Sequence, residues 1–288
     1  MDSTALALVV AGALFHAVWN LLAKRCSAGA SFVWLYGGVG VVAGLPFAVA
    51  CSSDIRSLGG LTWLAIVASG VIHLAYSLVL QRGYQLSELS VVYPTARGSG
   101  PLFALVVAMT LMGERPAMAG WAGILAIIAG VILMSDLPSA NPLRSARARR
   151  GIVWGVTTGL TIAGYTLVDG WALTRLGAQP LIYYFLGLVI RSVLLAPAVL
   201  RDAGALASQW RRHGRTIVAV GILSPLAYAM TLLAMTRAPL VYVAAAREVA
   251  MLFGVVLGAL VLREVLTGAR VAGAACMLGG VTLLGFAG

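Results

Sequence analysis

The chain has 288 residues, of which 61% are hydrophobic and only 10% are charged. Soluble domains average about 25% charged residues, so this composition, with a mean hydropathy of +0.97, excludes a soluble enzyme, a disordered tail and a disulfide scaffold. The net charge of +11 does not indicate nucleic-acid binding, because basic residues in membrane proteins mainly set orientation. The three cysteines are isolated, which predicts neither a disulfide framework nor a metal cluster.

Apolar segments of about 20 residues, enough to cross a hydrocarbon core of about 30 Å, follow one another along the chain. Polar breaks divide them into ten predicted membrane helices, at residues 4–23, 30–50, 59–81, 89–112, 118–135, 151–172, 180–200, 216–236, 240–262 and 268–287. The fold class is therefore an all-α polytopic membrane protein, because barrel strands would alternate apolar and polar residues in runs of about ten.

The longest hydrophilic stretch, residues 136–150, follows the fifth predicted helix and contains two prolines and four arginines. We predict that it is a basic linker between two five-helix halves, residues 1–135 and 151–288. The halves are related, because residues 97–133 align without gaps with residues 247–283. The identical pairs include Arg97/Arg247, Phe103/Phe253, Glu114/Glu264, Gly123/Gly273 and Gly130/Gly280.

Small and apolar residues match by chance in such chains, whereas intramembrane charges are rare. The arginine and glutamate pairs therefore indicate an internal repeat. Because each half has an odd number of helices, the second must be inverted relative to the first. Inverted repeats are common in secondary transporters, whose substrate sites lie between the repeats near the bilayer midplane.

The loops on one side of the predicted membrane hold most of the basic residues. These are Lys24, Arg25, Arg82, Arg144, Arg147, Arg149, Arg150, Arg201, Arg211, Arg212, Arg215, Arg263 and Arg270, against Arg56, Arg115, Arg175 and Arg237 on the other side. The positive-inside rule places the first set, and with it the loop 136–150, in the cytoplasm and both termini outside. We expect a multi-pass protein of the cell (inner) membrane.

Three arginines, Arg97, Arg191 and Arg247, lie inside predicted helices. An intramembrane charge costs at least about 2.5–3.5 kcal/mol on insertion scales, so such residues mark function. Arg97 and Arg247 enter from opposite sides, and a pseudo-two-fold axis would bring both guanidinium groups to one central region. Two such groups suit a carboxylate, phosphate or phosphonate, because each donates two hydrogen bonds at once. Alternatively, each arginine pairs with a glutamate or with free carbonyls and is structural.

Glu248 points about 100° away from its neighbour Arg247 on a helix. It is therefore free to pair with Arg97, with Arg191 or with a substrate ammonium. We expect Asp169, in the sixth predicted helix, to bind an amine or to pair with Arg191. Burial can raise the proton affinity of a carboxylate, so Glu248 and Asp169 are candidates for carrying a coupling proton.

Further polar and aromatic residues share faces of the predicted helices. His16, Trp19 and Asn20 lie on one face of the first helix, and His16 is a third candidate for proton coupling, although a buried histidine can equally be a hydrogen-bonded packing residue. Tyr76, Tyr165 and Tyr228 lie on the third, sixth and eighth helices, each on a face with other polar residues. We expect these helices to line a cavity.

Other residues predict local structure. Pro94 and Pro101 each remove a backbone hydrogen bond and predict a kink in the fourth helix. Glu114 and Glu264 end the fourth and ninth helices, where an anion opposes the helix dipole, and we expect them to be interfacial anchors. Close helix packing is expected at three glycine pairs, Gly40 and Gly44, Gly155 and Gly159, and Gly254 and Gly258.

The chain resembles the EamA-type permeases of the drug/metabolite transporter superfamily over essentially its whole length. The resemblance rests on residues 16–20 with Lys24, Tyr93 to Gly98 with Pro101, 113–115, 165–170 and 242–248, together with the ten helices and the repeat. It implies a carrier of small metabolites, often an exporter, and a central cavity lined by helices 1, 3, 4, 6, 8 and 9, to which Tyr93 would contribute. Arg263 stands where the first half has Gly113, so one family motif is incomplete.

The leading hypothesis is a secondary transporter, an exporter or exchanger, of a small anionic or zwitterionic metabolite such as an amino acid or an aminophosphonate. The chain lacks a phosphate-binding loop of the Gly-x-x-x-x-Gly-Lys-Ser/Thr type, so we expect the energy to come from a gradient or from exchange. We expect no cofactor. The two alternatives are a translocator of lipids or lipid phosphates, and an intramembrane enzyme built on Ser99. The expected partners are the small substrate and the bilayer, and a monomer would contain both halves.

Overall fold

A computed structural model describes the chain except residues 25–28, 88, 135–145, 263–266 and 287–288. Every regular element of the described part is helical. The helices are α1 (Ser3–Lys24), α2 (Ala30–Ala50), α3 (Ser52–Arg56), α4 (Gly60–Leu86), α5 (Leu89–Leu111), α6 (Met118–Met134), α7 (Ala146–Arg175), α8 (Pro180–Val199), α9 (Ala203–Met235), α10 (Leu240–Ala246), the 3₁₀ helix η1 (Arg247–Val249), α11 (Ala250–Leu262) and α12 (Gly268–Phe286).

These helices fall on the ten predicted spans. Within the described residues, eight helical stretches are long and apolar enough to cross a membrane, and residues Thr95–Leu111 and Met118–Leu133 form shorter apolar helices. Large apolar side chains cover the outside, and Leu111 and Phe286 are each 80% exposed. An exterior of this kind is suited to lipid rather than water, and the chain is a multi-pass membrane protein.

Two helices begin earlier than their predicted spans. α7 begins at Ala146 rather than 151, so the last residues of the predicted linker are helical, while residues 135–145 lie outside the described part. α9 begins at Ala203 rather than 216, and its backbone is non-helical at His213 (φ −129°, ψ 15°). This kink separates a polar first section of α9 from the apolar section that spans the membrane.

Within the described residues, the ninth span is the one whose α-helical backbone is interrupted. α5 is one continuous helix across Pro94 and Pro101, so these prolines do not end the helix, and the kink predicted there stays a prediction. The ninth span is divided into α10, η1 and α11, and the 3₁₀ turn carries Arg247 and Glu248. Every residue of α10 and η1 is buried, so this broken span runs through the core. A 3₁₀ turn inside a helix often marks a hinge or a functional site.

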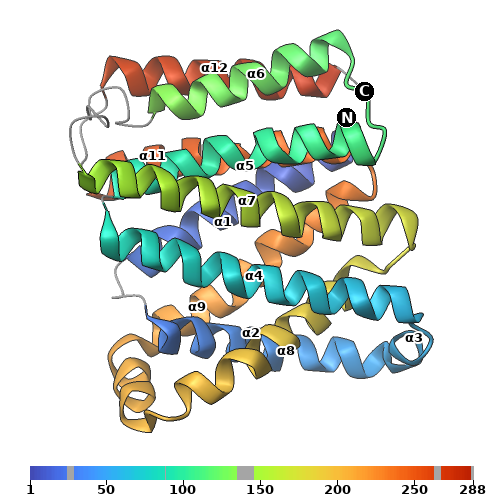
Figure 1. Ribbon diagram of the computed structural model, residues 1–288, viewed down its shortest axis with the longest axis vertical. Helices are drawn as coiled ribbons and strands as arrows, with labels where there is room; N and C mark the ends of the chain where they lie inside the picture. Colours follow the sequence, from blue (N-terminus) through green and yellow to red (C-terminus); the bar gives the residue numbers. More distant parts are fainter. Residues whose placement is uncertain (25–28, 88, 135–145, 263–266, 287–288) are drawn as a thin grey trace.

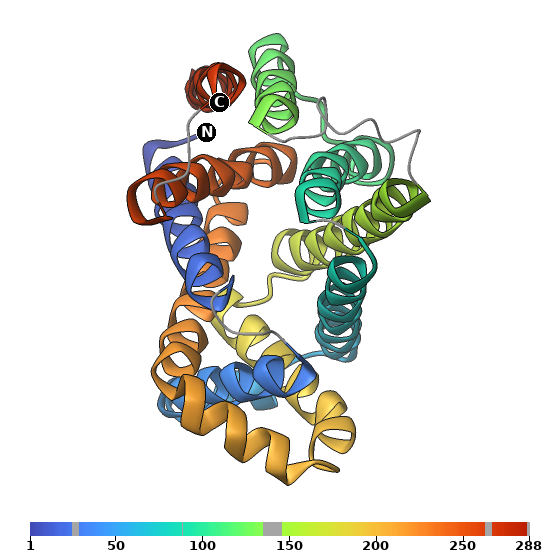
Figure 2. The same ribbon diagram turned by 90° about the vertical axis from the view of Figure 1, so that its left-hand side faces the viewer.

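The helices of one half pack mainly on helices of the other half (Figure 1 and Figure 2). The contact of α1 with α9 has its counterpart in α4 with α7, and that of α2 with α9 in α4 with α8. The contact of α1 with α11 likewise corresponds to that of α5 with α7. Exchanging the two halves therefore reproduces the helix contacts, which is the pattern of a pseudo-two-fold repeat.

Glycines at the contact between α6 and α12 show how these two helices run relative to each other. A Cβ atom on Gly123 would lie 2.8 Å from the carbonyl oxygen of Gly280, and one on Gly130 would lie 2.7 Å from that of Gly273. The two helices are thus antiparallel, and exchange of the repeats maps each contact onto the other, as in an isologous interface. The inverted repeat predicted from the sequence is confirmed.

The predicted glycine pairs divide into two groups, and Gly40 and Gly44, beside Leu188 and Phe185, belong to the closely packed one. Gly155 and Gly159 let α7 approach α5 closely, because Cβ atoms there would lie within 2.6 Å of Thr95 and 2.1 Å of Ser99. A Cβ on Gly254 would meet nothing within 4 Å among the described residues. The expected close packing at Gly254 is therefore absent from the contacts within this chain.

Candidate functional site

Charged side chains from both halves meet in the interior. Arg97 on α5 is 4% exposed, and Glu248 on η1 is 1% exposed. Their atoms Nη1 and Oε1 lie 3.5 Å apart. Arg97 also donates through Nη2 to Nε2 of His16 on α1. The structure thus places Glu248 against Arg97, one of the three partners considered for it, in a salt bridge that links the two repeats.

Arg247 lies in the same interior region but contacts aromatic groups. Its Nη2 atom donates to the Tyr165 hydroxyl at 3.0 Å, and its guanidinium carbon lies 5.7 Å from the ring centre of Tyr165 and 5.9 Å from that of Tyr228. Aromatic faces stabilise a desolvated guanidinium. These contacts leave its other terminal nitrogen, Nη1, buried and without a hydrogen-bond partner in the described part of the chain.

Two further buried polar atoms near Arg247 lack partners. They are Oε2 of Glu248 and Oγ1 of Thr166 on α7, and no described atom satisfies either of them. All three residues line one small pocket, together with Gly100, Pro101, Ala104, Ile162 and Ala244. Most buried polar groups in proteins are hydrogen-bonded, and an exception requires an explanation such as a water or a ligand.

The three atoms differ in chemistry. Arg247 offers a charged donor, Glu248 a charged acceptor, and Thr166 a hydroxyl that can do either. A group with both an acid and an amine would satisfy all of them. Thr166 was not among the predicted site residues, since a threonine in an apolar helix usually bonds its own backbone.

Asp169 belongs to a second interior network. It is completely buried, its Oδ1 accepts from the Tyr183 hydroxyl at 2.8 Å, and its Oδ2 accepts from the Tyr228 hydroxyl at 2.5 Å. His73 on α4 lies 3.3 Å from Oδ2. Pairing with Arg191 was one of the two roles predicted for Asp169, and this prediction is wrong. Arg191 instead donates to the Tyr184 hydroxyl at 3.3 Å.

Aromatic rings connect this network to Arg247. Tyr165 stacks on His73 with ring centres 3.9 Å apart, and Tyr228 lies edge-on to His73 at 5.0 Å. Tyr76 contacts Tyr165 edge-on at 5.7 Å. The structure thus brings all three predicted tyrosines into one aromatic cluster, in which Tyr165 and Tyr228 contact His73 and Tyr76 contacts Tyr165.

The remaining predicted residues lie at the edge of this region. On α1, Asn20 donates to the backbone oxygen of His16 at 2.7 Å, and the Trp19 ring lies edge-on to His16 at 4.9 Å. The Trp19 indole nitrogen is buried without a partner in the described residues. The side chain of Tyr93 lies outside the described part.

Glu114 is a structural residue of a different kind from the one expected. Its two carboxylate oxygens accept from the backbone nitrogens of Leu240 at 2.9 Å and Val241 at 3.1 Å. It therefore caps the N-terminus of α10, where a negative charge favours the helix dipole. The sequence did not predict this capping role of Glu114, and Glu264 lies outside the described residues.

Ser99 does not have the surroundings of a nucleophile. Its hydroxyl donates to the backbone oxygen of Thr95 at 2.7 Å and packs against Gly159 of α7. A serine nucleophile needs a base within hydrogen-bonding reach. These contacts give Ser99 a role in helix packing.

Known proteins share both the sequence pattern and the fold. A sequence profile described as the EamA-like transporter family matches residues 3–136 and again residues 149–286, so each half of the chain carries the family pattern. No curated protein matches the sequence significantly. A solved crystal structure of a protein has a TM-score of 0.79, with 16% sequence identity, and covers 98% of this chain and 96% of its own. At that identity the likeness shows the fold alone.

Proposed function

The chain belongs to the EamA-like transporter family, and we propose that it is a secondary transporter of a small anionic or zwitterionic metabolite, such as an amino acid or an aminophosphonate. Family membership makes it a membrane transporter of the drug/metabolite superfamily. The substrate class comes from the interior site, where Arg97, Arg247 and Glu248 lie between the two repeats.

Three unpartnered atoms in one pocket support this substrate class most strongly. An acid group would accept a hydrogen bond from Nη1 of Arg247, and an amine would donate to Oε2 of Glu248. The Thr166 hydroxyl would bond either group. Leaving a buried charged group unsatisfied costs about 1–3 kcal/mol or more, so a zwitterion that pairs both charges would recover this free energy.

The salt bridge between Arg97 and Glu248 gives the site a means of responding to its ligand. Glu248 holds Arg97 through one oxygen only, at 3.5 Å, so an incoming acid group would compete for Arg97. We propose that the ligand weakens this link between the repeats and so favours movement of one repeat against the other. The buried site must open to one side at a time, which is the alternating access expected of inverted repeats.

Proton coupling would use residues of the same cluster. Glu248 has one oxygen without a partner, and His16 contacts the other end of the Arg97 guanidinium. Either group could take up a proton as the ligand leaves. Asp169 is the third candidate, although its oxygens already accept from Tyr183 and Tyr228. The driving force would be an ion gradient or exchange of metabolites.

The proposed orientation follows the basic residues. Exposed Arg147, Arg149 and Arg150 open α7, and the positive-inside rule would place this end of the bundle in the cytoplasm. We propose that the protein lies in the cell (inner) membrane with both termini outside.

Thermal unfolding of the purified protein with a panel of small molecules tests the proposed substrate class. The panel contains amino acids, aminophosphonates, carboxylates, amines and short-chain lipid phosphates. A ligand at a hundred times its Kd stabilises the native state by about 2.7 kcal/mol. We expect a zwitterion or anion to stabilise wild type, and Arg247→Gln, Glu248→Gln and Thr166→Val to weaken that response. Arg237→Gln, at an exposed position, is the matched control.

Other responses would overturn the substrate class. Stabilisation by lipid phosphates alone would favour the lipid translocator. Stabilisation by amines that survives Arg247→Gln would make the arginines structural and leave Glu248 as the binding group.

A further inference from the structure

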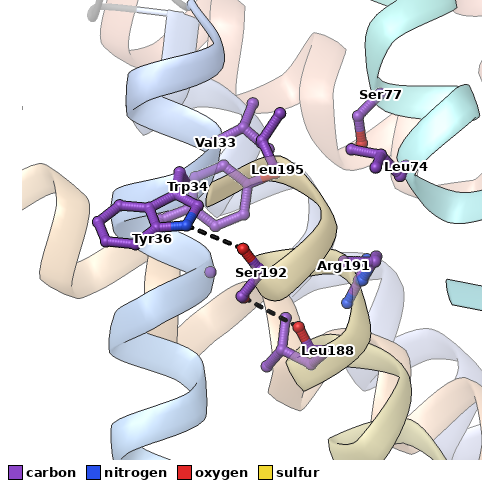
Figure 3. A pocket seen from close by; sticks show the side chains of 10 residues that line it. Val33, Trp34, Tyr36, Leu74, Ser77, Leu188, Arg191, Ser192 and Leu195 are labelled. Carbon is purple, nitrogen blue, oxygen red and sulfur yellow. Dashed lines mark hydrogen bonds between the residues drawn. The ribbon is translucent and has the colours of Figure 1, made fainter. Parts of the chain in front are cut away.

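A second, small pocket lies between α2, α4 and α8. Figure 3 shows Arg191 and Ser192 on α8, Trp34 and Tyr36 on α2, and Ser77 on α4 around this space. None of these residues lines the pocket of Arg247 and Glu248. The third intramembrane arginine of the sequence therefore faces a site of its own.

Arg191 lacks the partner that a membrane arginine usually has. Its contacts are the Tyr184 hydroxyl at 3.3 Å and the Tyr184 ring, whose centre lies 5.4 Å from the guanidinium carbon. No carboxylate of the described residues lies within 4.0 Å of it. An arginine at this depth costs at least about 2.5–3.5 kcal/mol and generally pairs with an anion or faces a water-filled cavity.

The other polar groups of the pocket also suit an anion. The Tyr36 hydroxyl has no hydrogen-bond partner among the described residues, so it can donate beside Arg191. The hydroxyls of Ser77 and Ser192 donate to their own helices, at His73 (3.0 Å) and Leu188 (2.9 Å). The free donors of the site are thus a guanidinium and a phenol, a combination that binds carboxylate or phosphate oxygens.

The position of the pocket connects it with the central site. Val33 to Gly37 belong to the first turns of α2, while Leu74 and Ser77 of α4 and Arg191, Ser192 and Leu195 of α8 lie in the second halves of those helices. Successive spans alternate in direction. The pocket-lining parts of α2, α4 and α8 therefore lie toward the end of the bundle where α7 begins with its arginines. Toward the centre, Tyr184 contacts the Tyr228 ring at 5.3 Å, and Tyr228 faces Arg247 at 5.9 Å.

We propose that this pocket is a second anion site, which holds the acid group of the transported metabolite between the basic end of the bundle and the central site. Its ligand is a carboxylate or phosphonate of a small molecule. That this small molecule is the transported substrate rests on the proposed function. The anion site itself does not, because it follows from Arg191, Tyr36 and the space between them.

Trp34 provides a direct probe of this pocket. Its indole nitrogen donates to the backbone oxygen of Ser192 at 2.9 Å, so the ring is fixed beside the residue that follows Arg191. Iodide quenches indole fluorescence and is an anion, whereas acrylamide is a neutral quencher. The fluorescence of Trp34 is obtained by subtracting the fluorescence of Trp34→Phe from that of wild type, with both proteins in detergent. An anion site concentrates iodide around this ring, since a cationic cleft raises the local concentration of counter-ions.

We expect Arg191→Gln to reduce iodide quenching of Trp34 at least about threefold, because the attraction for anions in the cleft is lost. Arg191→Lys should retain it, and acrylamide should quench all three proteins equally, which shows that the variants are folded and the pocket is open. Glutamate should compete with iodide in wild type. Equal iodide quenching in wild type and Arg191→Gln, or none in either, would overturn the anion site.

The source of the anion is distinguished in nanodiscs with and without phosphatidylglycerol. If the anionic lipid abolishes iodide quenching and glutamate does not, the pocket holds a lipid headgroup and the metabolite is ruled out. Arg247→Gln separates the two proposals, because it should abolish ligand stabilisation while the iodide response of Trp34 persists. Loss of the iodide response alone would leave the proposed transport function standing.

Discussion

Asp169 is predicted to stabilise the fold rather than to contact the substrate. Its carboxylate is completely buried and accepts hydrogen bonds from Tyr183, Tyr228 and His73. Replacing it by alanine would leave Tyr228 and His73 without their acceptor. Tyr183 would keep a second contact, with the backbone oxygen of Ala65 at 3.3 Å.

The cost can be worked from these contacts. Each buried donor left unsatisfied costs about 1–3 kcal/mol, so the two donors that lose their acceptor, on Tyr228 and His73, together cost about 2–6 kcal/mol. We therefore expect Asp169→Ala to lower the free energy of unfolding by about 2–6 kcal/mol, which corresponds to a fall in Tm of roughly 4–18 °C at about 2–3 °C per kcal/mol. Tyr183→Phe removes one bond and should cost about 1 kcal/mol.

Thermal unfolding in detergent, with and without the stabilising ligand, measures both effects. The rise in Tm caused by the ligand should be retained in Asp169→Ala. In the triple variant His73→Leu, Asp169→Leu, Tyr228→Phe, the loss should be smaller than the sum of the single losses, because no unpaired polar group remains. If Asp169→Ala melts within about 2 °C of wild type and loses ligand binding, Asp169 is a substrate residue and the reasoning fails.

Three more predictions concern the fold. Glu114→Ala should lower stability by about 2 kcal/mol, because the first two backbone nitrogens of α10 lose their cap, and Arg115→Ala is its control. Gly130→Leu should disrupt the contact of α6 with α12 and impair folding, whereas Gly254→Leu, which meets nothing within 4 Å, should not; equal Tm values would contradict the interface. A C-terminal reporter that is active only in the cytoplasm should stay inactive, and activity would reverse the proposed orientation.

The ten spans and the repeat could be predicted because each has a local cause. A membrane helix requires about 20 apolar residues, and the repeated Arg97/Arg247 pair stands out against an apolar background. The break at Arg247 could not be predicted, since residues 240–250 hold no proline or glycine and the geometry there depends on burial in the core. The early start of α7 was missed because its arginines read as a linker, although alanine and arginine both favour helix.

The site was partly predictable for the same reason. A buried charge appears in the sequence as a charged residue within an apolar run. This criterion identified Arg97, Arg247, Glu248 and Asp169. Their pairing depends on which helices are neighbours and how each is rotated. Asp169 therefore meets His73 rather than Arg191, and Thr166, whose side chain is common in membrane helices, carried no signal except its place beside Tyr165.

Flux in proteoliposomes tests most directly whether the central site transports a small acid metabolite. Liposomes preloaded with the ligand that stabilises the protein would be diluted into labelled ligand, and exchange across the membrane followed with time. Wild type and Arg237→Gln should accumulate label, whereas Arg97→Gln, Arg247→Gln and Glu248→Gln should reduce the rate at least about tenfold, as expected when a buried charged contact of about 1.4 kcal/mol or more is lost. Undiminished exchange by Arg97→Gln and Arg247→Gln would contradict the account.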